Sequence, residues 1–215
     1  GMERRAIIFD LDGVIVSTDN CHYQAWKKLA DEEGIYFDEE INQRLRGVSR
    51  MDSLEIILER ANRNYSIAEK NEMAERKNNY YRDLIRKLTP DHILPGVMRV
   101  LNGLKNNEIK IAIGSSSKNT SLILEKIGLD DFFDAVADGN DIAKSKPDPE
   151  VFLIAAEKLG VPPEKCLVVE DANAGVEAAL TGGMAVLGVG AAANNKKATL
   201  KAPDLAAVSW EELVK

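Results

Sequence analysis

Short apolar runs rich in β-branched residues recur along the chain, and a long block without such a run separates the first from the rest. The runs cover 5–9, 109–114, 135–137, 166–169 and 185–189. Helix-compatible segments alternate with them from residue 95 onward, which is the pattern of βαβ units around a parallel sheet. Runs this short and this apolar are typical of strands that are covered on both faces. We therefore predict an α/β fold with a doubly wound, Rossmann-like parallel sheet.

The block between the first two runs is rich in charged residues and helix formers. Apolar residues recur in it with helical spacing over 21–33, 39–45, 50–63 and 66–88. This pattern predicts an all-helical cap inserted after the first strand of the sheet. We expect a catalytic core of residues 1–18 and 89–215 and a cap of residues 19–88, joined near 13–18 and 89–96.

Composition restricts the class of protein. The chain has 215 residues, of which 45% are hydrophobic and 29% charged, as expected for a globular protein. Its net charge of -7 argues against nucleic acid as a partner. No apolar run approaches the ~18 residues that cross a bilayer, so we expect a cytoplasmic protein without a membrane partner. Separately, we expect a monomer. Cys21 and Cys166 lack a metal-ligand spacing, which favours free thiols.

Two carboxylates, Asp10 and Asp12, follow the first apolar run directly. Ligands of open α/β sheets bind outside the carboxyl ends of the strands, so both residues should lie at the mouth of a site. On a continuing strand both side chains would point to the same side and repel each other, and a bound cation would relieve the repulsion. Taken alone, such a spacing is more often a feature of an ordinary loop or Asx-turn than of a catalytic centre.

Further polar clusters follow other predicted strands. Ser115–Asn119 leads into a helix and suits a phosphate, although a serine there could simply cap the helix. Lys146 lies in a proline-rich turn and could bring a positive charge to the site, or could be an ordinary surface lysine. Glu170 and Asp171 offer the hard oxygen ligands that Mg²⁺ accepts, or could cap the helix that begins near Asn173.

These clusters, in this order, resemble the haloacid dehalogenase superfamily over nearly the whole chain. The resemblance implies that Asp10 is the nucleophile and Asp12 the general acid/base. It implies that Ser115 and Lys146 hold phosphate. It also implies Mg²⁺ as the cofactor, bound by Asp10, Asp12, Glu170 and Asp171. The second aspartate is typical of the phosphoryl-transferring branch, so dehalogenation is not expected.

Segments in and around the helical block resemble the β-phosphoglucomutase family more specifically. They are 13–18 leading into His22, 45–50 and 75–80, together with 117–119. The resemblance implies that His22 couples cap closure to the acid/base. It implies that Arg50 grips the phosphate that is not transferred, a task that suits a guanidinium group. Further substrate contacts are implied for Thr18, Gly47, Lys77, Ser117, Lys118 and Asn119. Without the resemblance, His22 would be a packed or surface histidine and Arg50 a surface charge.

The reaction implied by this resemblance is the interconversion of β-glucose 1-phosphate and glucose 6-phosphate. It would pass through an aspartyl phosphate and a β-glucose 1,6-bisphosphate, with hexose phosphates as the small-molecule partners. A Mg²⁺-dependent sugar-phosphate phosphatase is the alternative, and a non-enzymatic phosphometabolite-binding module is a more distant one. Two departures from the family pattern are Ala172, where a serine is frequent, and the weakly charged loop 191–195. Neither removes a proposed catalytic group.

Overall fold

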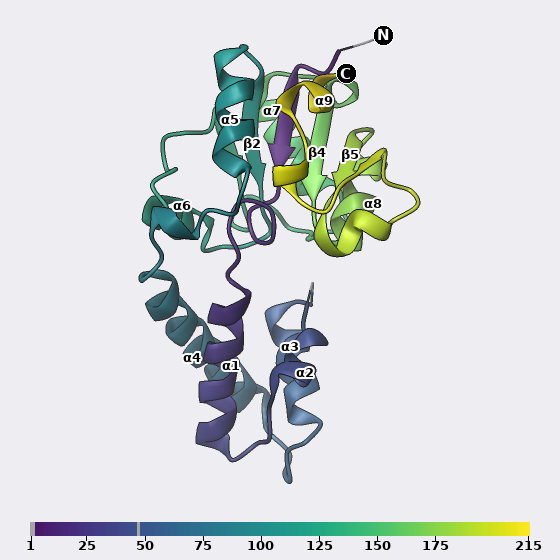
Figure 1. Ribbon diagram of the computed structural model, residues 1–215. Helices are drawn as coiled ribbons and strands as arrows, with labels where there is room; N and C mark the ends of the chain where they lie inside the picture. Colours follow the sequence, from purple (N-terminus) through teal and green to yellow (C-terminus); the bar gives the residue numbers. More distant parts are fainter. Residues whose placement is uncertain (1–2, 47) are drawn as a thin grey trace. The chain divides into compact units, whose positions relative to one another are not determined.

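The computed structural model describes residues 3–46 and 48–215. The chain divides into two compact units, Gly1–Ser17 with Thr89–Lys215 and Thr18–Leu88 (Figure 1). Within the described residues, no helix combines the length and the apolar character that crossing a membrane requires. The division into a catalytic core of residues 1–18 and 89–215 and a cap of residues 19–88 stays a proposal.

The first unit is built on a six-stranded parallel sheet with the strand order β3-β2-β1-β4-β5-β6. Its strands are β1 (Ala6–Phe9), β2 (Lys110–Gly114), β3 (Ala135–Ala137), β4 (Cys166–Glu170), β5 (Ala185–Gly188) and β6 (Leu200–Lys201). This is the order of the doubly wound Rossmann sheet, and it confirms the predicted α/β fold class. The direction in which successive strands are added reverses at β1, where such sheets bind their ligands.

The register of β1 decides which residues meet at the carboxyl edge of the sheet. Phe9, the last residue of β1, is paired with Ile113 of β2 and with Val169 of β4. The main chain continues this pairing for one more residue, because the Asp10 N–H donates to the Val169 carbonyl at 3.0 Å. The next residue of each strand, which is Asp10, Gly114 or Glu170, therefore lies beside the other two at the carboxyl edge of the sheet.

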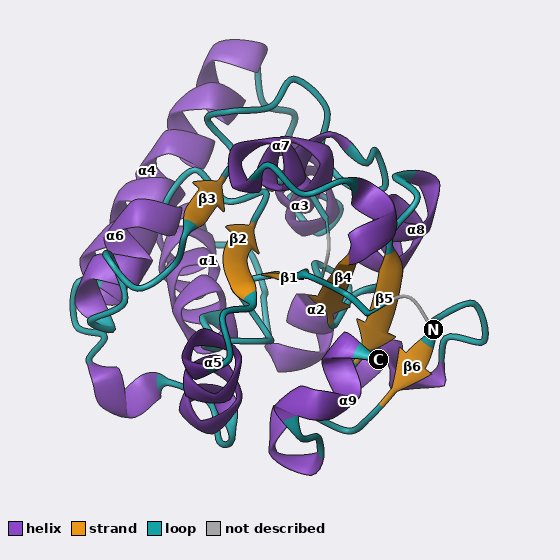
Figure 2. Ribbon diagram, turned by 90° about the horizontal axis from the view of Figure 1, so that it is seen from above, coloured by secondary structure: helices purple, strands orange, loops and turns teal. Residues whose placement is uncertain are grey.

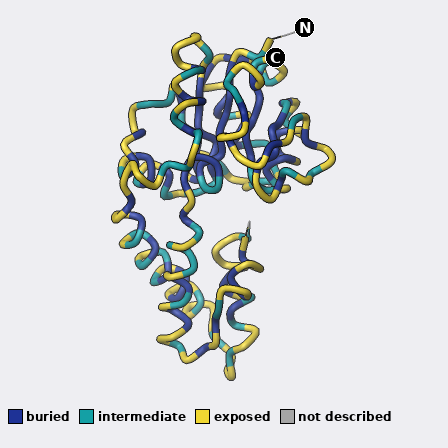
Figure 3. The backbone as a smooth tube through the Cα atoms, in the orientation of Figure 1, coloured by how far each residue is buried: buried dark blue, intermediate teal, exposed yellow. Residues whose placement is uncertain are grey.

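Helices cover both faces of the sheet (Figure 2). They are α5 (Val97–Asn106), α6 (Thr120–Lys126), α7 (Glu150–Leu159), α8 (Asn173–Thr181) and α9 (Trp210–Val214). Ile8 and Val168 pack in one cluster with Phe152 of α7 and Val176 of α8, while α5 and α9 lie over the opposite face. The central strands are buried throughout (Figure 3), which is why their sequences are continuous apolar runs rather than alternating ones.

The second unit is helical and has its own apolar cluster. Its helices are α1 (Asp19–Glu33), α2 (Glu39–Gln43), α3 (Arg50–Leu58) and α4 (Ile67–Ile85). Trp26 of α1, Leu54 of α3 and Met73 of α4 are buried together in this cluster. A capping box fixes the start of α4, since the Ser66 hydroxyl accepts from the Glu69 N–H and the Glu69 carboxylate accepts from the Ser66 N–H.

The structure corrects several predicted element boundaries. Four strands differ slightly: those predicted at 5–9, 109–114, 166–169 and 185–189 are observed at 6–9, 110–114, 166–170 and 185–188. Three helices also differ: those predicted at 21–33, 39–45 and 66–88 are observed at 19–33, 39–43 and 67–85. The largest error is at α3, which ends at Leu58 instead of Arg63, before Asn62 and Asn64, which favour turns. β6 and α9 were missed because elements of two and five residues carry too few apolar repeats to be recognised.

The expectation that Asp10 and Asp12 both lie on a continuing strand was wrong. β1 ends at Phe9, so Asp10 and Asp12 lie in the turn that follows it, and strand alternation does not govern their side chains. Asp12 instead forms an isolated bridge with Val16. Gly13, which lies between Asp12 and Val16 in the chain, has a φ of 86°, a left-handed conformation that favours glycine.

The central strand should tolerate truncation poorly. Ile8 is completely buried, so we expect Ile8→Ala to lower the free energy of unfolding by about 2–5 kcal/mol. Leu180→Ala is the control, because Leu180 is 37% exposed on α8 and should cost less than about 1 kcal/mol. Urea denaturation of both variants measures the difference. Equal losses would contradict the placement of Ile8 in the core.

Candidate active site

The ammonium group of Lys146 joins the ends of three neighbouring strands. Its Nζ donates to Asp10 Oδ1 at 3.0 Å, to Glu170 Oε2 at 2.8 Å and to the Gly114 carbonyl at 3.2 Å. It also lies 4.7 Å from the centre of the Phe152 ring. The Lys146 side chain is only 11% exposed, so the alternative of an ordinary surface lysine was wrong.

Burial and charge act on Lys146 in opposite directions. Burial alone would lower the pKa of the ammonium group, but the adjacent carboxylates of Asp10 and Glu170 outweigh it, and the pKa is raised above its ordinary value. The side chain therefore remains a cation at neutral pH. Because lysine offers three N–H donors, the three acceptors saturate it.

Glu170 is fully buried and uses both carboxylate oxygens. Oε2 accepts from Lys146, while Oε1 accepts from the N–H groups of Asp171 at 3.0 Å and Ala172 at 3.2 Å. Ala172 is the N-cap of α8, and no side chain caps that helix. The role of simple helix cap, which was the alternative for the acidic pair, was therefore wrong.

Three carboxylates converge at this edge of the sheet. Single oxygens of Asp10, Glu170 and Asp171 lie within 4.8 Å of one another. Burial, followed by the negative charge of Asp10, raises the pKa of Glu170 well above its ordinary value and that of Asp171 to about 7. Hard oxygen donors that repel one another suit a divalent cation such as Mg²⁺. Asp12 does not belong to this group of oxygens, so its predicted part in metal binding stays a prediction.

The absence of a side chain at Gly13 leaves the space that the Asp171 carboxylate fills. A Cβ atom built on Gly13 would lie 1.9 Å from Asp171 Oδ2. The turn after β1 therefore needs glycine twice over, for its left-handed backbone and for the space that the carboxylate fills.

The hydroxyl groups after β2 organise their own loop. Ser115 is buried, and its Oγ accepts from the Ser117 N–H at 3.2 Å. Ser117 Oγ in turn accepts from the Asn119 N–H at 3.1 Å, and the Thr120 hydroxyl donates to the Ser117 carbonyl at 2.8 Å. The N-cap of α6 is Asn119, so the alternative that a serine caps this helix was wrong. Lys118 lies in the same loop and is exposed.

In the helical unit, the buried Lys77 and the partly buried His22 form a polar pair. Lys77 Nζ lies 2.8 Å from His22 Nδ1, and since an ammonium group can only donate, Nδ1 is the acceptor. Burial and the charge of Lys77 hold the pKa of His22 well below its ordinary value. His22 is therefore neutral and carries its proton on Nε2.

Tyr81 completes this arrangement. Its ring stacks on His22 with a centroid distance of 4.0 Å, and its hydroxyl donates to Thr18 Oγ1 at 2.9 Å. Lys77 lies 4.8 Å from the centres of the Tyr81 and Trp26 rings. Tyr81 was not among the predicted site residues, although its position four residues after Lys77 places both on one face of α4.

The remaining predicted residues of the helical unit are less enclosed. Arg50 is the exposed first residue of α3, behind an N-cap in which the Ser49 hydroxyl accepts from the Asp52 N–H at 3.2 Å. Gly47 lies outside the described residues. The predicted site residues thus fall into two groups, one at the carboxyl edge of the sheet and one in the helical unit.

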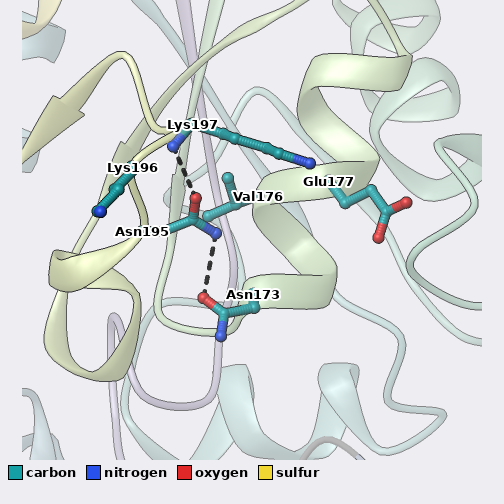
Figure 4. Close-up of a pocket in the computed structure, with 6 residues that line it drawn as sticks. All are labelled: Asn173, Val176, Glu177, Asn195, Lys196 and Lys197. Carbon is teal, nitrogen blue, oxygen red and sulfur yellow. Dashed lines mark hydrogen bonds between the residues drawn. The ribbon is translucent and has the colours of Figure 1, made fainter.

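A surface depression of about 340 Å³ lies beside the start of α8 (Figure 4). It is lined by Asn173, Val176, Glu177, Asn195, Lys196 and Lys197. Asn195 ties the loop to α8, because its Nδ2 donates to Asn173 Oδ1 at 3.1 Å and its Oδ1 accepts from the Lys197 N–H at 2.9 Å. None of the carboxylates around Lys146 lines this depression.

Comparison with known proteins identifies the family. A family model described as a haloacid dehalogenase-like hydrolase matches residues 4–183. The chain belongs to this family. The roles of Asp10, Lys146 and the acidic pair at the carboxyl edge stay predictions.

Individual relatives are similar over most of their length. The chain is 48% identical over 188 residues to a β-phosphoglucomutase of Bacillus subtilis, covering 86% of this chain and 83% of the relative. It is 32% identical over 213 residues to a phosphorylated carbohydrates phosphatase of Thermotoga maritima, covering 97% and 96%. A solved structure of a β-phosphoglucomutase from Clostridium difficile superposes with a TM-score of 0.87 at 45% identity, covering 97% and 95%.

Repulsion within the acidic cluster predicts a stabilising substitution. The pKa of Asp171 in the folded protein, about 7, lies above its value of about 4 in an unfolded chain. The protonated carboxyl therefore contributes stability below pH 4 that is lost as the pH rises toward 7. We expect Asp171→Asn to raise the Tm of the protein in chelator at pH 8, and to raise it less at pH 5. A lower Tm at pH 8 would contradict this account.

Proposed function

We propose that this protein interconverts β-glucose 1-phosphate and glucose 6-phosphate by phosphoryl transfer through Asp10. The observation that carries the proposal is the buried contact of Asp10 with Lys146, held in turn by Glu170, at the end of the central strand. The 48% identity to a β-phosphoglucomutase supports the choice of reaction. We further propose that the protein acts on hexose phosphates as a cytoplasmic monomer.

In the proposed reaction, an Asp10 carboxylate oxygen attacks the phosphorus atom of the 1-phosphate of β-glucose 1,6-bisphosphate. A bond forms between that oxygen and phosphorus while the bond from phosphorus to the sugar oxygen breaks. Both reactants are anions, so the adjacent ammonium group of Lys146 offsets part of their repulsion. Glucose 6-phosphate leaves, and the phosphoryl group then passes from Asp10 to the 6-hydroxyl of β-glucose 1-phosphate, which regenerates the bisphosphate.

The acidic cluster fits Mg²⁺, for which Asp10, Glu170 and Asp171 are the proposed ligands. When bound, the ion would neutralise charge on the transferred phosphoryl group and on the carboxylates. Ser115 and its loop are proposed to bind the same phosphoryl group. The Ser115 hydroxyl and the loop N–H groups are the donor types that phosphate requires.

Asp12 is proposed to handle the proton. Its carboxylic acid would protonate the sugar oxygen as the first bond to phosphorus breaks, and its carboxylate would remove the proton of the attacking hydroxyl in the second half-reaction. Arg50 is proposed to bind the phosphate that is not transferred. His22 is proposed to act in positioning, because a histidine whose pKa is held well below its ordinary value is a weak base and does not take the proton that Asp12 handles.

A sugar-phosphate phosphatase is the second candidate, and one observation favours it. The relative from Thermotoga maritima that covers 97% of this chain is named a phosphorylated carbohydrates phosphatase. The two reactions share the attack by Asp10 and differ in what removes the phosphoryl group, a sugar hydroxyl or water. They are separated by assaying conversion of β-glucose 1-phosphate with a bisphosphate primer beside phosphate release from hexose phosphates.

The nucleophile is tested by Asp10→Asn. The amide cannot form the acyl phosphate, so we expect mutase and phosphatase turnover to fall below detection while the circular dichroism spectrum stays that of the wild type. Coupled detection of glucose 6-phosphate and a phosphate-release assay measure both activities on one preparation. Turnover within about tenfold of wild type would remove Asp10 from the mechanism.

Arg50→Lys separates the mutase from the phosphatase. The substitution keeps the charge but loses the planar fork that binds a phosphate through two hydrogen bonds. We expect mutase kcat/KM to fall about tenfold or more, with little change in hydrolysis of a small phosphomonoester. Arg60→Lys, the same change at another exposed arginine of the helical unit, serves as the control. Equal effects of Arg50→Lys on both reactions would count against the role in binding a second phosphate.

A further inference from the structure

Gly175 stands inside a helix for a reason other than backbone conformation. It is the third residue of α8, is buried, and its φ lies outside the left-handed region. Glycine is among the poorest residues for a helix interior, since it loses the most conformational freedom on folding. Alanine would be preferred there unless something occupied the place of its methyl group.

The Glu170 carboxylate occupies that place. A Cβ atom built on Gly175 would lie 2.0 Å from both Cδ and Oε2 of Glu170. Oε2 is the atom that accepts from Lys146 at 2.8 Å. The carboxylate has little freedom to move away, because its Oε1 already accepts from two main-chain N–H groups.

We propose that Gly175 is a positioning residue, whose missing side chain lets Glu170 hold Lys146 beside Asp10. A methyl group would push Oε2 away from Lys146, and the ammonium group would lose one of its three acceptors. The consequence for turnover rests on the proposed function. The steric relation between Gly175 and Glu170 does not.

The test is Gly175→Ala, measured by thermal unfolding, by calorimetric titration with Mg²⁺ and by kinetics. We expect a lower Tm, a Kd for Mg²⁺ raised about 10–100-fold, and a kcat lowered by a similar factor. Gly103→Ala is the matched control, since Gly103 is also helical and its Cβ would lie 2.4 Å from the Trp210 ring. Gly103 lies near the C-terminal end of α5, which leads into the start of β2. This is the edge of the sheet opposite to the carboxyl edge that carries the site. Gly103→Ala should lower the Tm and leave the Mg²⁺ affinity and kcat unchanged.

A second background keeps the test decisive even if the single variant is too unstable to purify. Glu170→Asp withdraws the carboxylate by one methylene group and leaves room for a methyl on residue 175. In that background we expect Gly175→Ala to raise the Tm, because alanine is the better helix former. A lower Tm or failure to fold in both backgrounds would overturn the proposal, as would wild-type Mg²⁺ affinity and kcat in the single variant. If the Tm effect reverses but the wild-type protein shows no mutase activity, the proposed function is refuted and the steric relation stands.

Discussion

The contact of Lys146 with Asp10 and Glu170 is the interaction on which the rest of the site depends. A buried ammonium group is costly unless it is paired and fully hydrogen-bonded, and removing one partner of such a pair costs about 3–5 kcal/mol. Lys146 meets this condition with acceptors from the ends of β1, β2 and β4. The sheet order brings these three ends together, so the fold supplies the partners and the partners keep the lysine charged.

The acidic side of the site is left with more negative charge than the lysine balances. Asp171 adds a carboxylate to the pair already bound by Lys146, and the raised pKa of Asp171 reflects this excess. The helical unit shows the opposite arrangement, in which Lys77 and neutral His22 lie among aromatic rings. Each unit therefore keeps an ionisable group in an unusual state through its own packing.

The residues at the strand ends could be predicted because the signals were local. Apolar runs followed at once by Asp10 or by Glu170 and Asp171 indicated both the strands and the edge where their ends meet. The conformation of Asp12 could not be predicted, because side chains alternate only as far as the strand continues, and β1 ends at Phe9. The part played by Tyr81 depends on how α4 packs against α1, and apolar spacing does not specify that packing. Short elements such as β6 escaped for lack of periodicity.

The central position of β1 also governs the order in which the protein can assemble. A chain emerging from the ribosome presents β1 first, yet its neighbours β2 and β4 follow only after the helical unit and much of the core have been made. The contact between Asp10 and Lys146 spans 136 positions, so it closes late, after a large loss of chain entropy. The contacts of the helical unit, by contrast, lie within one continuous segment. Until Lys146 is made, β1 ends in a carboxylate without its cation, and until β4 is made, one edge of this apolar strand stays unpaired. In this period the nascent chain is open to chaperones and to aggregation.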